Sequence, residues 1–267
     1  MRNVRGRRAR RGSLTVVGTG IDVTTQLTPG ARAAIERSDE VLYLVADSLS
    51  ALRIANLNPR ARSLDEFYGP DKNRRQTYAE IVDTIVASAV AGADVCAVFY
   101  GHPGVFAYPG HEALARVREA GLPARMLPAV SALDCLVADL GIDPGRTGLQ
   151  SYEATYFLLH RPAIDPNAML LLWQVGMIGE LGGAATPAVK ARFKLLIDQL
   201  RDCYGEAREA LLYEASPYPG PEPAAARFHL GDSELPAPSP ISTLCVLADS
   251  VPPVDVKARA LLAFSER

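Results

Sequence analysis

The sequence has no long hydrophobic run and few cysteines, and each absence excludes a class of protein. Hydrophobic residues make up 48% of the 267 residues, yet no apolar run approaches the roughly 18 residues that a bilayer-spanning helix needs. The four cysteines, Cys96, Cys135, Cys203 and Cys245, lie far apart, with neither a metal-knuckle nor a redox-pair spacing. We therefore expect a cytoplasmic protein with reduced cysteines, no metal site and no membrane association.

Basic residues are scarce outside the start of the chain. Six of the 28 lysines and arginines are arginines within residues 1–12. The remainder has 22 basic against 30 acidic residues, a net charge near −8. We expect residues 1–12 to be a disordered basic arm. An acidic body argues against nucleic acid as a partner, because nucleic-acid binding depends on clustered positive charge.

The first half alternates apolar segments with amphipathic ones. This alternation predicts a mostly parallel sheet covered by helices. Thr28 followed by Pro29 is typical of a helix N-terminus. Gly18 and Gly20 end the first strand, but Val23 replaces the third glycine of a dinucleotide-binding fingerprint. The expected strands are residues 14–17, 40–45, 95–100 and 124–127, and the expected helices are 28–37, one from 48, 73–91, 111–120 and 130–140.

The second half predicts a second group of strands and helices. We expect strands at residues 153–159, 168–175, 209–215 and 241–247, a helix at 187–202, and surface loops at 216–224 and 233–240. The fold class is therefore α/β. We expect an N-terminal α/β domain at residues 13–128, a C-terminal α/β domain at 129–250, and a short tail at 251–267.

Residues 68–78 and 95–106 gather three tyrosines, an arginine and a histidine near the end of a strand. Ligands of open α/β sheets bind at the carboxyl ends of strands. Arg74 precedes Tyr78 by four residues, which places both side chains on one face of the expected helix. Two alternatives stay open: Tyr78 as an aromatic at the edge of the core, and Arg74 as part of a solvated basic patch.

Several motifs, taken together and in order, resemble the tetrapyrrole methylase family of S-adenosylmethionine-dependent methyltransferases. They are Val16-Val-Gly18-Thr-Gly20, Tyr100-Gly-His-Pro-Gly104, Leu127-Pro-Ala-Val-Ser131-Ala132 and Pro240-Ile-Ser-Thr243. Residues 68–78, 98–106, 138–145, 150–154 and 172–175 are similar to its borosin branch, the peptide backbone N-methyltransferases. The resemblance covers roughly residues 13–250, and such motifs are specific only as a set.

The resemblance implies two α/β domains of the tetrapyrrole methylase type, with S-adenosylmethionine in the cleft between them, and a homodimer. It implies methylation of main-chain amides in a ribosomally made peptide. By matching motif positions, the catalytic set is Tyr68, Arg74, Tyr78 and Tyr100. The implied cofactor contacts are Tyr100, His102, Val105, Phe106, Ser131, Ala132, Gln174, Tyr213, Ala215, Ser242 and Thr243.

Two departures from the family affect these expectations. Pro128-Ala-Val-Ser131 stands where the family usually has Pro-Gly-Ile-Ser. Fused borosin enzymes carry their substrate as a C-terminal tail, whereas this sequence ends at Arg267 without an apolar core peptide. It therefore resembles the split form, which acts on a separate precursor peptide. The alternatives are a tetrapyrrole or RNA-ribose methyltransferase, and an inactive homologue that binds a peptide or the cofactor.

Backbone N-methylation makes specific demands on a site. The amide nitrogen shares its lone pair with the carbonyl and is a poor nucleophile. A base that removes the N–H proton and donors that stabilise charge on the carbonyl oxygen would help. We expect Tyr68 or Tyr78 to be the base, since a nearby Arg74 favours the phenolate. Arg74 would also hold the oxygen, and Tyr100 would orient the amide or the methyl donor.

Overall fold

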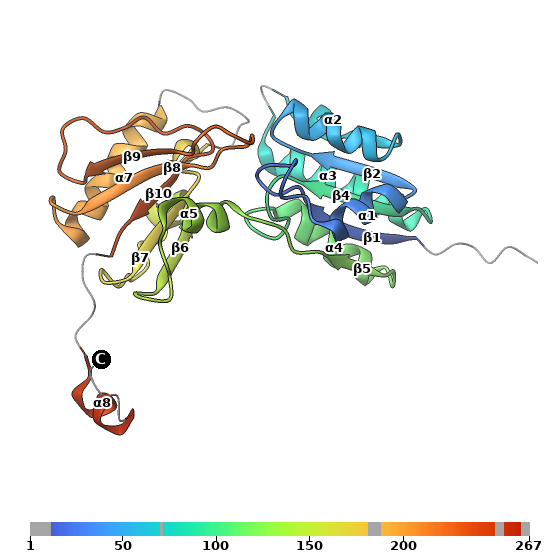
Figure 1. Ribbon diagram of the computed structural model, residues 1–267. Helices are drawn as coiled ribbons and strands as arrows, with labels where there is room; N and C mark the ends of the chain where they lie inside the picture. Colours follow the sequence, from blue (N-terminus) through green and yellow to red (C-terminus); the bar gives the residue numbers. More distant parts are fainter. Residues whose placement is uncertain (1–11, 70–71, 181–187, 249–253, 263–267) are drawn as a thin grey trace, which may run out of the picture. The chain divides into compact units, whose positions relative to one another are not determined.

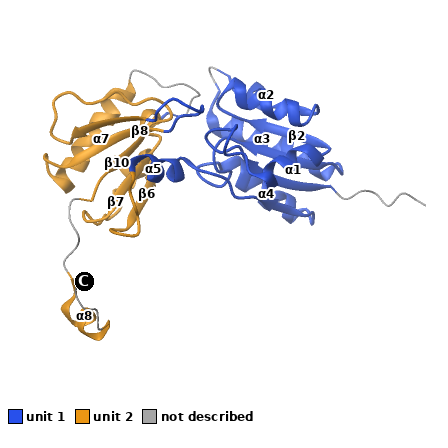
Figure 2. Ribbon diagram, viewed as in Figure 1, with its two compact units in different colours: residues 1–140, 180–184, 215–223 blue, residues 141–179, 185–214, 224–267 orange. Residues whose placement is uncertain are grey.

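The computed structural model describes residues 12–69, 72–180, 188–248 and 254–262. Within them the chain forms two compact units (Figure 1, Figure 2). The first unit runs to Leu140 and also takes in residues 215–223, while the second begins at Gly141. Residues 1–11 of the expected basic arm lie outside the described residues, as do parts of the tail at 251–267.

The first unit is built on an entirely parallel sheet (Figure 1). Its strands pair in the order β3-β2-β4-β1-β5, and every pairing is parallel. The sequence predicted four of these strands, but not the short β3. Their bounds are β1 (Ser13–Gly18), β2 (Glu40–Leu44), β3 (Ala61–Ser63), β4 (Asp94–Phe99) and β5 (Ala124–Met126).

Helices cover both faces of this sheet because its central strand is apolar on both sides. In β4, Val95, Ala97 and Phe99 pack against α3 and α4, while Cys96 and Val98 pack against α1 and α2. Such burial on both faces is typical of parallel sheets. The helices that pack on the sheet are α1 (Pro29–Arg37), α2 (Ser48–Leu57), α3 (Arg74–Val90) and α4 (Tyr108–Glu119). The unit also contains α5 (Ala132–Leu140) and a 3₁₀ turn, η1, at Asp65–Phe67.

Two caps fix where the helices of the first unit begin. The Thr28 side chain accepts a hydrogen bond from the Ala31 N–H, which confirms the predicted start of α1. Asn73 accepts in the same way from the Arg75 N–H and so begins α3. A side-chain acceptor at this position satisfies a backbone donor that the helix itself cannot pair. Arg74 is therefore the first residue of α3, and Tyr78 lies one turn further along it.

The second unit has a mixed sheet with the order β6-β7-β10-β8-β9. β6 and β7 are parallel, whereas β10 runs antiparallel to β7 and β8, and β9 antiparallel to β8. The core lies between the sheet and α6 and α7. The elements are β6 (Leu149–Glu153), α6 (Ala154–His160), β7 (Met169–Trp173), η2 (Val175–Met177), α7 (Ala188–Tyr204), β8 (Glu209–Glu214), β9 (Ala224–His229) and β10 (Thr243–Val246).

The predicted strand at residues 153–159 is wrong, because this segment is helix α6. Glu153 ends β6, and its carboxylate accepts a hydrogen bond from the Tyr156 N–H, which caps the helix. Ala154 and Phe157 are buried three residues apart, a helical spacing. The sequence analysis also missed β9, whose residues are nearly all exposed and carry no alternating apolar pattern.

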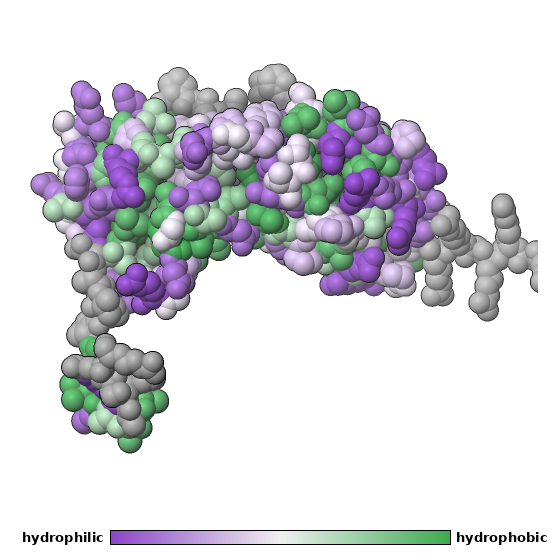
Figure 3. Space-filling model, viewed as in Figure 1, coloured by the Kyte–Doolittle hydropathy of each residue, from purple (hydrophilic) through white to green (hydrophobic). Residues whose placement is uncertain are grey.

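The last helix, α8 (Val256–Leu262), buries none of its side chains. Its apolar residues Val256, Leu261 and Leu262 are exposed, and Figure 3 shows green surface on this helix. Among the described residues, no helix has the length and apolar composition that crossing a bilayer requires.

Candidate functional site

The strand order of the first unit defines where a ligand would bind. From β1 the chain crosses to β2 on one side, and from β4 it crosses to β5 on the other, while β1 and β4 are neighbours. Ligands of open α/β sheets bind where the connections diverge in this way, at the carboxyl ends of the strands. The loops after β1 and β4 therefore flank the candidate site.

Backbone contacts join these two loops. The Gly101 N–H donates to the Gly20 carbonyl at 3.0 Å, and the Gly20 N–H donates to the Gly101 carbonyl at 3.3 Å. Both glycines have a positive φ, +73° at Gly20 and +67° at Gly101, which glycine adopts most readily. A Cβ on Gly18 would lie 2.0 Å from the Gly101 carbonyl oxygen. This close approach needs glycine and leaves bare main chain at the carboxyl ends of β1 and β4.

Tyr68, Arg74 and Tyr78 lie close together at the same edge of the sheet. Burial raises the pKa of Tyr68, the Tyr78 hydroxyl raises it further, and the Arg74 charge lowers it. Arg74 acts on the Tyr68 pKa in the expected direction, but the cost of burying a phenolate outweighs the attraction of the guanidinium. Tyr68 is therefore a protonated hydrogen-bond donor at neutral pH.

Arg74 has an unused donor. Its Nε is buried and has no hydrogen-bond partner among the described residues. Leaving a buried donor unpaired costs about 1–3 kcal/mol, so such groups commonly mark a place for a missing partner. Beside it, the ring of Tyr78 stacks on Tyr108 with a centroid distance of 6.2 Å and an interplanar angle of 25°. The cluster holds two donor groups, the Tyr68 hydroxyl, which is hydrogen-bonded to Tyr78, and Arg74 Nε.

Tyr100 is the first residue after β4. Its N–H donates to the Leu44 carbonyl at 3.1 Å, which fixes it at the end of the sheet. Burial, together with smaller contributions from the neighbouring Cys135 and Asp47, raises the pKa of Tyr100 to about 12. Tyr100 is therefore also a neutral phenol at physiological pH.

The loop after Tyr100 presents apolar side chains to its surroundings. The Val105 N–H donates to the His102 carbonyl at 3.1 Å and closes a turn. Val105 and Phe106 are 41% and 47% exposed. Phe106 has a φ of +52°, which is uncommon for any residue with a Cβ and is often found at binding sites.

Ser131 and Ala132 stand at the start of α5. The Ser131 hydroxyl and N–H each donate to the Asp134 carboxylate at 2.7 Å, an arrangement that satisfies a free donor of the helix end. Burial works to raise the pKa of Asp134, but these hydrogen bonds outweigh it and hold the pKa below its usual value. Ser131 therefore shapes the start of α5, and its hydroxyl is already committed to Asp134.

In the second unit the predicted residues gather at one edge of the mixed sheet. Because β10 runs antiparallel, its first residue, Thr243, pairs with Tyr213 near the end of β8. The Ser242 carbonyl accepts from the Val175 N–H, next to Gln174, at 3.3 Å. Gln174 itself has a φ of +59°. Tyr213, Ser242 and Thr243 are buried.

Sequence reasoning missed several residues of both clusters. In the second unit, Glu214 accepts a short hydrogen bond from the Ser242 hydroxyl. In the first, the sequence analysis predicted that α4 begins at His111, whereas the helix begins at Tyr108. Pro109 is a recognised helix-start signal and could have shown that Tyr108 lies on the helix. Ala215 follows β8 and opens the segment 215–223 of the first unit. Each unit thus brings together its own group of candidate site residues.

A cavity of about 510 Å³ lies between α3 and α4. Tyr78 and Tyr108 form its aromatic wall, and it begins at the edge that holds the tyrosine and arginine cluster. Its volume is within the range of small-ligand sites. The full lining is Arg75, Tyr78, Ala79, Val82, Tyr108, Glu112 and Arg116.

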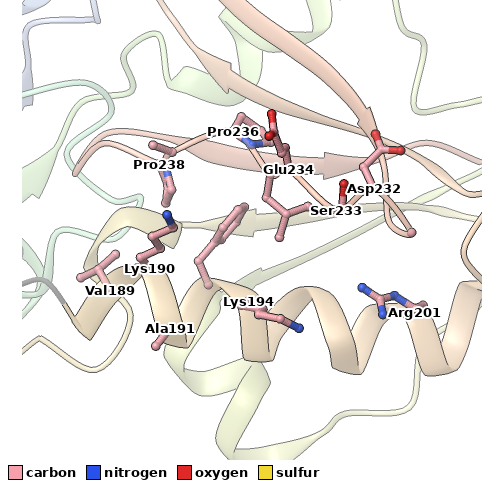
Figure 4. Close-up of a pocket in the computed structure, with 14 residues that line it drawn as sticks. Val189, Lys190, Ala191, Lys194, Arg201, Asp232, Ser233, Glu234, Pro236 and Pro238 are labelled. Carbon is pink, nitrogen blue, oxygen red and sulfur yellow. The ribbon is translucent and has the colours of Figure 1, made fainter.

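A second cavity, of about 1120 Å³, lies in the second unit between α7 and residues 231–238. Figure 4 shows Lys190, Lys194 and Arg201 on the helix, with Asp232 and Glu234 on the opposite segment. None of the predicted site residues lines it.

A parallel sheet with its site at the diverging strands, followed by a mixed sheet, is the architecture of one class of methyltransferases. The chain belongs to the family Tetrapyrrole (Corrin/Porphyrin) Methylases, which it matches over residues 13–219. Its fold is similar to that of uroporphyrin-III-C-methyltransferase from Thermus thermophilus, with a TM-score of 0.60 and 22% identity over 96% of this chain and 98% of that chain. Diphthine synthase is similar with a TM-score of 0.61, 16% identity, and 90% and 91% of the two chains covered.

More similar sequences occur among borosin proteins. The chain is 39% identical over 225 residues to the methyltransferase/ribosomally synthesized cyclic peptide dendrothelin A precursor of Dendrothele bispora, covering 84% of this chain and 54% of that protein. It is also 39% identical over 217 residues to the corresponding omphalotin A precursor of Omphalotus olearius, covering 81% and 52%. The chain spans about half the length of these relatives, whose names combine a methyltransferase with a peptide precursor.

Proposed function

We propose that this protein is an S-adenosylmethionine-dependent methyltransferase that methylates backbone amide nitrogens of a ribosomally made peptide. The cluster of Tyr68, Arg74 and Tyr78, with its unused Arg74 Nε, carries the proposal. The similarity to borosin methyltransferase precursors supports a peptide as the acceptor.

The residues present fit the cofactor. Gly18, Gly20 and Gly101 leave bare backbone at the diverging strands, and the exposed Val105 and Phe106 offer an apolar surface to an adenine-like ring. When bound, S-adenosylmethionine supplies a methyl group on a sulfonium. We propose the following residues as cofactor contacts: Tyr100, His102, Val105, Phe106, Ser131, Ala132, Gln174, Tyr213, Ala215, Ser242 and Thr243.

Each tyrosine has a different proposed role in the reaction of the acceptor amide. Tyr68, kept protonated by burial, donates a hydrogen bond to the amide oxygen, and Arg74 Nε supplies a second donor. Both stabilise charge that develops on the oxygen as the nitrogen loses its proton. We assign the base to Tyr78, and the orientation of the amide to Tyr100. The expectation of Tyr68 or Tyr78 as base thus becomes a proposal for Tyr78.

We place the acceptor chain in the cavity between α3 and α4. Tyr78 is both a wall of this cavity and a member of the catalytic cluster. The two stacked rings and Val82 suit an apolar side chain next to the acceptor amide. Arg75 makes no ion pair among the described residues, so its charge is available to a peptide carbonyl or carboxylate.

We further propose a cytoplasmic homodimer that acts on a separate precursor, the split form. Light scattering at micromolar concentration tests the dimer, and a monomer mass would contradict it. Measuring added mass on the intact protein as well as on the precursor separates action on a separate peptide from action on the same chain.

Tandem mass spectrometry tests the reaction. A candidate precursor peptide is co-expressed with the wild-type protein, with Tyr78→Phe, and with Tyr156→Phe, a change at an exposed tyrosine of α6. We expect methyl groups on backbone nitrogens with the wild type and Tyr156→Phe, and almost none with Tyr78→Phe. An unmodified peptide with a folded, cofactor-bound enzyme would refute the peptide acceptor and direct the same assay to tetrapyrroles and RNA.

A further inference from the structure

Two histidines bind the main chain of one residue, Gly104, in the loop after β4. His102 Nδ1 accepts a hydrogen bond from the Gly104 N–H at 3.0 Å. His111 Nε2, from the first turn of α4, lies 3.0 Å from the Gly104 carbonyl oxygen. The N–H and the carbonyl of this residue are therefore both bound by imidazoles, one from the loop and one from the helix behind it.

The chemistry of the partners sets the tautomer of each ring. An N–H can only donate, so His102 Nδ1 carries no proton and the proton of the neutral ring is on Nε2. A carbonyl can only accept, so His111 Nε2 carries the proton. Gly104 allows this arrangement: a Cβ there would lie 2.9 Å from Met126 Sδ and 3.4 Å from His102 Nδ1.

We propose that His111 is a positioning residue for cofactor binding, and that it acts with His102 as a clamp on Gly104. The clamp fixes the backbone just before Val105 and Phe106, the two exposed apolar residues of the loop. His111 acts through the main chain, whereas the proposed cofactor contacts lie on the loop itself. The inference rests on the proposed function, since it assigns the cofactor to this loop.

Protonation is expected to break only one of the two contacts, the one made by His102. A second proton on His102 would place an N–H against the Gly104 N–H and break that link, whereas protonated His111 still donates to the carbonyl. The charged groups that face His102 are Asp134 from α5, whose pKa the histidine lowers, and His111 across Gly104. Loss of the His102 contact in acid should therefore loosen the loop, while the His111 contact remains.

Nitrogen-detected NMR of the full-length protein tests the tautomers without any ligand. The sequence has four histidines, so ¹⁵N-histidine labelling gives few signals, which His111→Gln and His102→Asn assign. At pH 8 we expect an unprotonated Nδ1 in His102 and an Nε2–H in His111. A protonated Nδ1 in His102, or a His111 with unprotonated Nε2, overturns the clamp.

Calorimetric titration with S-adenosylhomocysteine tests the positioning role. His111→Phe keeps an aromatic ring without the donor, and we expect about fivefold weaker binding, as for loss of one hydrogen bond. In His111→Gln the side-chain amide can donate again, and we expect most of the affinity to return. His229→Phe, a change at an exposed histidine of the second unit, is the matched control.

The pH profile supplies the second criterion. Wild-type affinity should fall as the solution is made acidic from pH 8, and the affinity of His102→Asn should fall less, because asparagine keeps an acceptor oxygen that takes up no proton. Equal affinity of His111→Phe and wild type, or an unchanged profile in His102→Asn, overturns the proposal. A wild-type protein that binds no S-adenosylhomocysteine refutes the proposed function instead, and the tautomers still decide whether the clamp exists.

Discussion

The two units reach their candidate sites by different routes. In the first, every strand is parallel, so all the carboxyl ends meet at one edge and the loops that follow them supply the residues. In the second, the residues come from strands that run in opposite directions, and the start of β10 meets the end of β8. A simple positional rule finds the first site, whereas the second depends on the pairing of the strands.

The chemistry of the two sets differs as well. The first unit gathers ionisable groups, Tyr68, Arg74 and Tyr78, around an unused donor. The second offers buried neutral groups such as Ser242 and Thr243 and one strained backbone, at Gln174. The groups that we propose to act on the acceptor thus all lie in the first unit, whereas the second unit holds only groups that we propose as cofactor contacts.

The largest expected effect separates chemistry from binding within the first unit. Arg74→Lys keeps the charge but removes the Nε donor and the planar fork. We expect methylation to fall about 100-fold, the usual effect of losing one positioned donor. Affinity for S-adenosylhomocysteine, by calorimetry, should change less than threefold. Arg53→Lys, at an exposed arginine of α2 that has no proposed role, is the control, and equal losses in both variants would contradict the assignment.

The second prediction tests the binding role of the second unit. Gln174 and Arg161 both have a positive φ, +59° and +44°. Glycine at either position relieves about 1 kcal/mol of backbone strain in the folded protein. It also increases the conformational entropy of the unfolded chain, which lowers stability by a similar amount. We expect Gln174→Gly to weaken S-adenosylhomocysteine binding about tenfold, as for loss of one or two side-chain hydrogen bonds. Thermal melting should stay within a few degrees of wild type.

Arg161→Gly is the matched control, because Arg161 caps α6 and is not a proposed contact. It should leave cofactor affinity unchanged while its melting temperature also stays close to wild type. If both variants bind S-adenosylhomocysteine equally, the strained backbone at Gln174 has no binding role, and the comparison between the units fails on that side.

The third prediction concerns the acceptor cavity. Ala79 lines it and is exposed, so Ala79→Trp fills part of its volume without changing the catalytic cluster. We expect about tenfold slower methylation of the precursor, comparable to one unfavourable apolar fit in a pocket, with cofactor binding retained. Ala87→Trp, two turns further along the exposed side of α3, is the control. Equal rates for Ala79→Trp and wild type would move the acceptor elsewhere.

Sequence reasoning succeeded where local signals and tertiary structure agree. The cap at Thr28, the apolar strand β4 and the glycines after it each predicted their structure correctly. It failed at residues 153–159, which were predicted as a strand because they are largely apolar. They form a capped helix instead. It also missed β9, an edge strand whose exposed residues carry no pattern.

Within the site, motif resemblance named residues, but only the fold shows which of them meet. Thr243 and Tyr213 are thirty residues apart in sequence and are paired partners in the sheet. The net direction of the Tyr68 pKa could not be predicted from Arg74 alone, because it depends on burial. The clamp could not be predicted from the sequence either, because nothing in the sequence shows that His111 contacts the Gly104 carbonyl.

The smallest expected effect concerns Tyr100 and alkaline pH. Its pKa is raised to about 12 by burial, against about 10 in an unfolded chain. The unfolded state therefore releases this proton first, so stability that is complete below pH 10 declines as the pH rises from 10 towards 12. Tyr100→Phe removes the titrating group, and its denaturation midpoint should fall less than that of wild type between pH 9 and pH 11. Parallel declines would mean that Tyr100 ionises as readily in the folded protein as in the unfolded chain, and that burial does not keep it neutral at the carboxyl end of β4.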